Sequence, residues 1–155
     1  MCQQSAVDGM EMFLRNFARV PDDRLDWAPA PTAKSALRIG AHTALYASRF
    51  AKMIREQALP QPENLAAWLA EREAEERQIT DRRQIEPIFR AGTEEVLAAL
   101  ASLSPEDVAR TLDSGQGWSV PMTHLMRLPG WHATLHTGQI DYLQTCWGDM
   151  QVYVG

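Results

Sequence analysis

Residues 131–143 read Trp-His-Ala-Thr-Leu-His-Thr-Gly-Gln-Ile-Asp-Tyr-Leu, and they combine a helical pattern of apolar residues with two histidines. His132 and His136 lie four residues apart, so in an α-helix both imidazoles project from one face. The stripe at this spacing consists of Leu128, His132, Leu135, His136, Gln139, Ile140, Leu143 and Trp147. Since its rhythm is that of a core-facing surface, we predict an amphipathic helix that carries two imidazoles inward and ends near Gly148.

The N-terminal part of the chain predicts two long helices with a proline-rich loop between them. The first covers about residues 5–19 and ends before the loop at residues 21–31, whose three prolines oppose helix formation. The second begins after Ser35, whose side chain can cap a helix N-terminus, and continues until Pro60.

The middle of the chain predicts one short helix and one long helix. The short helix covers residues 65–77, is rich in Glu and Arg, and is expected on the outside with Trp68 and Leu69 as its contacts. The long helix carries apolar residues at helical spacing over residues 88–103, and Pro87 either starts it or kinks it.

These segments together predict an all-α protein. Strand-like alternation of apolar and polar residues is scarce. Four amphipathic helices with narrow apolar stripes can bury them together in a four-helix bundle, in which facing helices can also build a site. A chain of 155 residues is expected to form one domain, residues 1–155.

The bundle supplies a third imidazole to the histidine pair. His42 belongs to the apolar stripe of the second helix, with Ile39, Leu45, Tyr46, Phe50 and Met53. Neutral imidazole binds a divalent ion through one ring nitrogen, and three protein ligands leave coordination positions open for chemistry. The alternative is that the histidines are hydrogen-bonded core residues, which is the commoner role of a single inward histidine. His124 stands apart, and we expect it to be solvated or to act outside the ligand set.

Other metal motifs are excluded by residue type. A thermolysin-like zinc site needs Glu directly after the first histidine of the pair, and this chain has Ala133 there. A di-iron bundle needs Glu three residues before a histidine on two helices, and none of the four histidines has it. A mononuclear site of His42, His132 and His136 therefore remains the metal hypothesis.

Composition narrows the class of partner. The formal net charge is −5 and no dense basic cluster occurs, so nucleic acid is not an expected partner. No stretch approaches the length of a membrane span, and the N-terminal residues lack a secretion signal, which favours a cytoplasmic protein without a membrane partner. Cys2 and Cys146 form no metal or redox motif, and Cys146 is expected to be a small buried residue.

The chain resembles the DinB/YfiT-like superfamily of metalloenzymes over nearly its whole length. The resemblance rests on His132-Ala-Thr-Leu-His-Thr-Gly-Gln-Ile140 and on a Trp-Ala-Pro-Ala-Pro loop, residues 27–31, ahead of His42. It implies a four-helix bundle with a long crossover connection and a divalent ion held by three histidines, at the positions of His42, His132 and His136. Thr137 stands where the family usually has Arg.

The resemblance also implies a range of chemistry. Nickel or zinc is the expected metal, while iron and manganese also accept imidazole ligands. Characterised relatives include transferases and isomerases that use low-molecular-weight thiols, so a thiol cofactor and a small-molecule substrate are expected, as is a homodimer. The leading hypothesis is a metal-dependent enzyme of the thiol S-transferase or hydrolase type, in which Gln139 either orients a ligand or completes a core hydrogen bond. The alternative is a non-catalytic metal-binding, interaction or stress-response protein on the same bundle.

Overall fold

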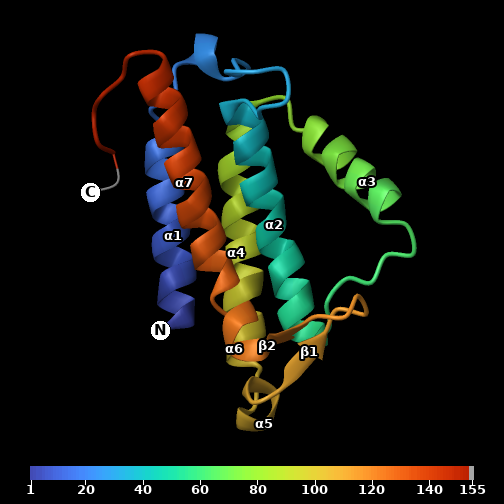
Figure 1. Cartoon of the computed structure of the whole chain (residues 1–155). Helices are drawn as coiled ribbons and strands as arrows, with labels where there is room; N and C mark the ends of the chain where they lie inside the picture. The colour runs from blue at the N-terminus through green and yellow to red at the C-terminus, as the bar shows by residue number, and fades with distance from the viewer. Residues whose placement is uncertain (154–155) are drawn as a thin grey trace.

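Four long helices lie side by side and form the body of the protein (Figure 1). The computed structural model describes residues 1–153. The four helices are α1 (Cys2–Phe17), α2 (Ala36–Glu56), α4 (Ile85–Ala101) and α7 (Leu128–Cys146). The predicted all-α four-helix bundle is therefore confirmed. Within the described residues, no helix is both long and apolar enough to cross a membrane.

The order of the helices requires a long connection in the middle of the chain. Helices α1 and α7 run in one direction, while α2 and α4 both run in the other (Figure 1). The chain must therefore return along the bundle between α2 and α4, and this crossover contains α3 (Leu65–Arg77) and the 3-10 turn η2 (Arg82–Gln84). The crossover expected from the family resemblance is confirmed, and the short helix has the predicted bounds.

Helix α3 stands away from the bundle over most of its length (Figure 1). Glu76, near its C-terminal end, is its one buried residue. Trp68 is half-buried and Leu69 is 50% exposed, so the two expected apolar contacts of α3 are only partly covered. The reason is that α3 meets the bundle chiefly at its C-terminal end, through polar groups instead of an apolar face.

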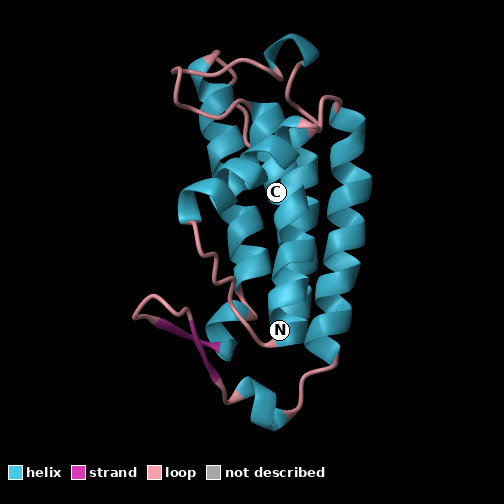
Figure 2. Ribbon diagram, turned by 90° about the vertical axis from the view of Figure 1, so that its right-hand side faces the viewer, coloured by secondary structure: helices cyan, strands magenta, loops and turns pink. Residues whose placement is uncertain are grey.

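The remaining elements are short and lie at the two ends of the bundle (Figure 2). They are η1 (Asp22–Arg24), α5 (Pro105–Val108), β1 (Thr111–Asp113), β2 (Ser119–Pro121) and α6 (Met122–Leu125). The two strands pair antiparallel, with Leu112 opposite Val120. Gly115 and Gly117 in the turn between them have φ values of 70° and 82°, a left-handed conformation that glycine adopts without a steric penalty.

Two sequence signals for helix starts correspond to observed geometry. The Ser35 side chain accepts a hydrogen bond of 3.3 Å from the backbone N–H of Arg38, which confirms it as the N-cap of α2. Pro87 is the third residue of α4, which begins at Ile85. In the first turn of a helix the missing N–H of proline leaves no intrahelical bond unmade, so Pro87 belongs to the start of the helix.

The buried face of α7 differs in part from the predicted stripe. Its buried residues are Pro129, Gly130, Ala133, His136, Thr137, Ile140, Leu143 and Gln144. Leu135 is 64% exposed and Gln139 is also exposed, so the predicted stripe is wrong at both positions. Cys146 is exposed as well, which contradicts its expected burial.

The close approach of α1 and α7 explains this difference. A Cβ atom built on Gly9 of α1 would lie 2.9 Å from the backbone oxygen of Gly130 and 3.1 Å from Cβ of Ala133. The backbones can approach this closely only where the facing residues are small. The small residues of α7 therefore face α1, and Leu135 points away from the core.

Gly92 marks a similar contact between α2 and α4, because an added Cβ would lie 2.7 Å from Cβ of Ala47. We expect Gly92→Ala to lower the free energy of unfolding by about 1–3 kcal/mol through overpacking, although Ala is the better helix former. Gly138→Ala in α7 is the matched control, since nothing lies within 4 Å of its added Cβ, and it should be neutral or stabilising by up to about 1 kcal/mol. Denaturant unfolding measures both, and equal effects of the two substitutions would contradict the assignment.

Candidate metal centre

Three imidazole rings from two helices meet between α2 and α7. Nε2 of His132 lies 3.2 Å from Nε2 of His42 and 3.1 Å from Nε2 of His136. The candidate ligand atoms of the three residues all lie within 4.8 Å of one another. The structure thus brings together the three histidines that the sequence singled out.

The spacing of these nitrogen atoms is suited to a single ion. Two imidazole nitrogens at roughly 2.0–2.1 Å from a tetrahedral ion are about 3.3 Å apart, close to both observed separations. The three histidines could therefore hold one metal ion. Because three ligands do not complete a coordination shell, such an ion would keep at least one open position.

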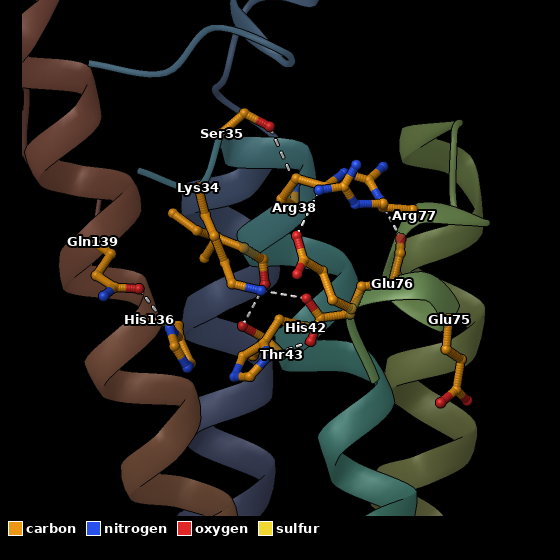
Figure 3. Close-up of polar contacts among 12 residues, drawn as sticks. Lys34, Ser35, Arg38, His42, Thr43, Glu75, Glu76, Arg77, His136 and Gln139 are labelled. Atoms are coloured by element: carbon orange, nitrogen blue, oxygen red, sulfur yellow. Dashed lines mark hydrogen bonds and ion pairs between the residues drawn. The ribbon is translucent and has the colours of Figure 1, made fainter. Parts of the chain in front are cut away.

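His42 is oriented by a carboxylate from outside the four-helix body. Its Nδ1 atom lies 2.6 Å from Oε1 of Glu76, which reaches it from α3 (Figure 3). Since an ionised carboxylate only accepts hydrogen bonds, Nδ1 of His42 carries a proton, and Nε2 is the ring nitrogen left to bind a metal ion. A histidine that donates its second N–H to a carboxylate is the usual arrangement of a metal ligand.

The Glu76 carboxyl is 4% exposed and binds Lys34 with its second oxygen. Burial alone would raise its pKa, but the hydrogen bonds from His42 and Lys34 outweigh burial and hold the pKa below its usual value. Glu76 is therefore ionised at neutral pH. Sequence reasoning missed this residue, because it is one of several glutamates in a charged helix and no local pattern sets it apart.

Arg38 fixes the segment that carries Glu76. Its guanidinium group donates hydrogen bonds to the backbone oxygens of Glu76 and Ile79, at the C-terminal end of α3. A cation at this end also interacts favourably with the helix dipole. Lys34 and Arg38 together hold the end of α3 against α2, which places the carboxylate although the rest of α3 is remote.

Gln139 orients the third imidazole. Its side-chain oxygen Oε1 lies 2.6 Å from Nδ1 of His136 (Figure 3), so Nδ1 donates to the amide and Nε2 faces the centre as an acceptor. Two roles were expected for Gln139, orienting a ligand or completing a hydrogen bond in the core. Because Gln139 is exposed and bonded to His136, the structure favours the first role.

The two rings of α7 are kept neutral by their surroundings. Burial, together with the charges of His136, His42 and Arg49, lowers the pKa of His132 to about 2. Burial also lowers the pKa of His136, in spite of its hydrogen bond to Gln139. Neutral imidazole is the form that binds a metal ion, so both rings of α7 are in the ligating state at neutral pH.

Aromatic contacts hold the rings in place, and a cavity reaches one of them. The Tyr46 ring stacks on His132 with centroids 5.0 Å apart and lies 4.4 Å from the centroid of His42, while Phe50 meets His132 edge to face. A cavity of about 870 Å³ between α2, α3 and the loop before α2 reaches His42. Small molecules thus have a route to one edge of the cluster.

His124 and Thr137 lie outside this cluster. His124 is exposed and makes an edge-to-face contact with Trp131, in agreement with its expected place outside the ligand set. Thr137 is buried and donates its hydroxyl hydrogen to the backbone oxygen of Ala133, so it serves the helix and the core.

The family model that describes the DinB superfamily matches residues 8–140. The chain belongs to the DinB superfamily. The fold has the same relatives: a DinB-like protein of Bacillus subtilis (YjoA) is similar with a TM-score of 0.68 and 19% identity, over 99% of this chain and 96% of that one. A conserved protein of Enterococcus faecalis is similar with a TM-score of 0.68 and 16% identity, over 92% of each chain. No curated protein matches this DinB chain.

The lowered pKa of His132 makes the stability of the metal-free protein depend on pH. The folded pKa of His132, about 2, lies below the value of 6.5 expected in the unfolded chain. Below pH 6.5 the unfolded state therefore binds more protons than the folded state, and the free energy of unfolding decreases as the pH is lowered. From pH 7 to pH 5 we expect His132 to cost about 2 kcal/mol in the free energy of unfolding.

Denaturant unfolding of chelator-treated protein at these two pH values measures this loss. The variant His132→Gln should lose less stability than wild type over the same interval, whereas His124→Gln, at an exposed histidine, should behave as wild type. An unchanged pH dependence in His132→Gln would refute the assignment.

Proposed function

We propose that this protein is a metal-dependent enzyme in which His42, His132 and His136 bind one divalent transition metal ion. The observation that carries the proposal is that Nε2 of His132 lies 3.2 Å from Nε2 of His42 and 3.1 Å from Nε2 of His136, with all candidate ligand atoms within 4.8 Å of one another. Two of these rings donate their other N–H to an oxygen acceptor, Glu76 or Gln139. Such a set, with three imidazole ligands and two orienting acceptors, has the composition of a reactive metal site.

A bound divalent ion with an open position would lower the pKa of a coordinated water or thiol and would polarise an electrophile. The contribution of the chain is to fix the three imidazoles. Glu76 sets the tautomer of His42, Gln139 sets that of His136, and Tyr46 limits the movement of His132 by stacking. Burial keeps His132 and His136 unprotonated, so protons compete little with the ion for these two rings near neutral pH.

The reaction that we propose is transfer to a low-molecular-weight thiol, or hydrolysis, with a small-molecule substrate and with nickel or zinc as the ion. Membership of the DinB superfamily supports this class. The cavity of about 870 Å³ at His42 favours an enzyme over a purely structural metal site, because a structural ion is enclosed by four protein ligands.

Metal content tests the proposal directly. Protein purified without a histidine tag should contain close to one equivalent of a divalent transition metal, measured by elemental mass spectrometry. We expect His132→Ala to lose the ion and His124→Ala to retain it, because His124 is exposed and outside the cluster. A wild-type protein that neither contains nor takes up a divalent ion while remaining folded would rule the proposal out.

Glu76 gives a second and finer test. We expect Glu76→Gln to weaken metal affinity by about 10- to 100-fold, because the charged acceptor that orients His42 is lost. Glu73→Gln is the matched control on the same helix, since Glu73 pairs with Arg77 and is exposed. Competition with a chromophoric chelator measures both affinities, and equal affinities for the two variants would show that Glu76 has no role in metal binding.

A further inference from the structure

A second cavity lies beside the metal centre, between α2, α3 and the segment that joins them. Its volume is about 480 Å³, within the range of small-molecule sites. Much of its wall is apolar or aromatic, with Tyr46, Met53, Leu59 and Trp68 among the lining residues. The proposed metal chemistry uses none of these residues except Tyr46.

Two arginines from different helices line this cavity. Arg49 projects from α2 and its side chain is 16% exposed, while Arg72 projects from α3 and its side chain is 32% exposed. Each guanidinium lies over an aromatic ring, Arg49 at 4.6 Å from the centroid of Tyr46 and Arg72 at 5.0 Å from that of Trp68. The rings thereby hold both cations in fixed orientations at the cavity wall.

The two arginines share a single acidic partner. Oε2 of Glu75 lies 2.6 Å from Nη2 of Arg49 and 3.4 Å from Nη1 of Arg72. One carboxylate thus faces two guanidinium groups, which leaves one positive charge uncompensated. Lys52, the third cation of the wall, is paired with Glu56 on its own helix and adds no net charge.

The hydrogen-bonding capacity of this pair is also incompletely used. Nη1 of Arg49 and Nε of Arg72 are buried and have no hydrogen-bond partner. A guanidinium N–H that is removed from water without an acceptor is energetically unfavourable. A small shift of either side chain toward an added anion would form the missing hydrogen bond and stabilise the complex. Glu75 itself is 45% exposed and can move toward solvent to make room.

The cavity is joined to the metal centre through its wall. Tyr46 and Arg72 line both this cavity and the larger one that reaches His42. The Tyr46 ring also stacks directly on His132. A molecule bound here would therefore lie next to the side chains that hold the candidate metal ligands.

We propose that the cavity between α2 and α3 binds an organic acid, with its carboxylate on Arg49 and Arg72 and its apolar part along Met53, Leu59 and Trp68. The carboxylate of Glu75, which already contacts both guanidinium groups, indicates the kind of group that they accept. Planar guanidinium groups match carboxylates in geometry and charge. That this acid is the substrate rests on the proposed metal enzyme, but the binding itself requires no metal.

Isothermal titration calorimetry with octanoate and its neutral analogue octanamide tests the site, on both metal-free and metal-loaded protein. We expect octanoate to bind in both states and octanamide at least about tenfold more weakly, because a charge-assisted hydrogen bond contributes more than a neutral one. Arg72→Gln and Arg49→Gln should each weaken octanoate binding by about tenfold or more. Octanoate should still bind to His132→Ala.

Arg55→Gln is the matched control, since Arg55 is an exposed arginine of α2 outside the cavity, and it should bind octanoate as wild type does. Circular dichroism verifies that each variant is folded, and metal content should be unchanged in Arg72→Gln. The acid site is refuted if octanoate does not bind, if octanamide binds equally well, or if Arg55→Gln weakens binding as much as Arg72→Gln does. A folded wild-type protein that binds octanoate but neither contains nor takes up a divalent ion would refute the metal proposal alone.

Discussion

The hydrogen bond between Glu76 and His42 joins two parts of the protein that differ in composition. On one side lies the apolar core of the bundle, and on the other a charged helix that contributes one buried residue to it. An ionised carboxylate is costly to bury, and here the cost is offset by Lys34 and by the imidazole N–H. Glu76 therefore sets the tautomer of His42 and also, with the contacts of Lys34 and Arg38, fixes the C-terminal end of α3.

The parallel arrangement of α2 and α4 explains why such a helix exists at all. Two parallel neighbours cannot be joined by a short turn, so the chain must cross back along the bundle. The returning segment covers one side of α2 with α3 and thereby creates both cavities. It also brings Glu76 to the candidate metal centre and Arg72 to the second cavity. A topological requirement of the fold thus supplies Glu76, the carboxylate that orients His42.

The centre has a cost in stability that its arrangement reduces only in part. With Nδ1 of His42 and of His136 engaged by Glu76 and Gln139, both of their Nε2 atoms face Nε2 of His132, so in neutral rings at most one N–H serves two acceptors. A core of apolar residues at these positions would avoid that cost. Three oriented imidazole rings are expected in place of such a core where their lone pairs bind one cation.

Local sequence patterns were sufficient for the helices and for the three histidines. Helical periodicity, prolines and the Ser35 cap act over a few residues, so they predicted four long helices, the bounds of α3 and the inward direction of His42, His132 and His136. The local patterns could not predict which face of α7 is buried, because that face is selected by the close approach of α1 at Gly130. Leu135 was misplaced for this reason.

The sequence by itself therefore determined the helices, the bundle and the identity of the three imidazoles. Only the tertiary structure selected Glu76 from a run of similar glutamates and brought Arg49 and Arg72 to one cavity. Helical spacing relates residues on one helix, whereas partners on separate helices are chosen by how the helices pack and by where the crossover returns the chain.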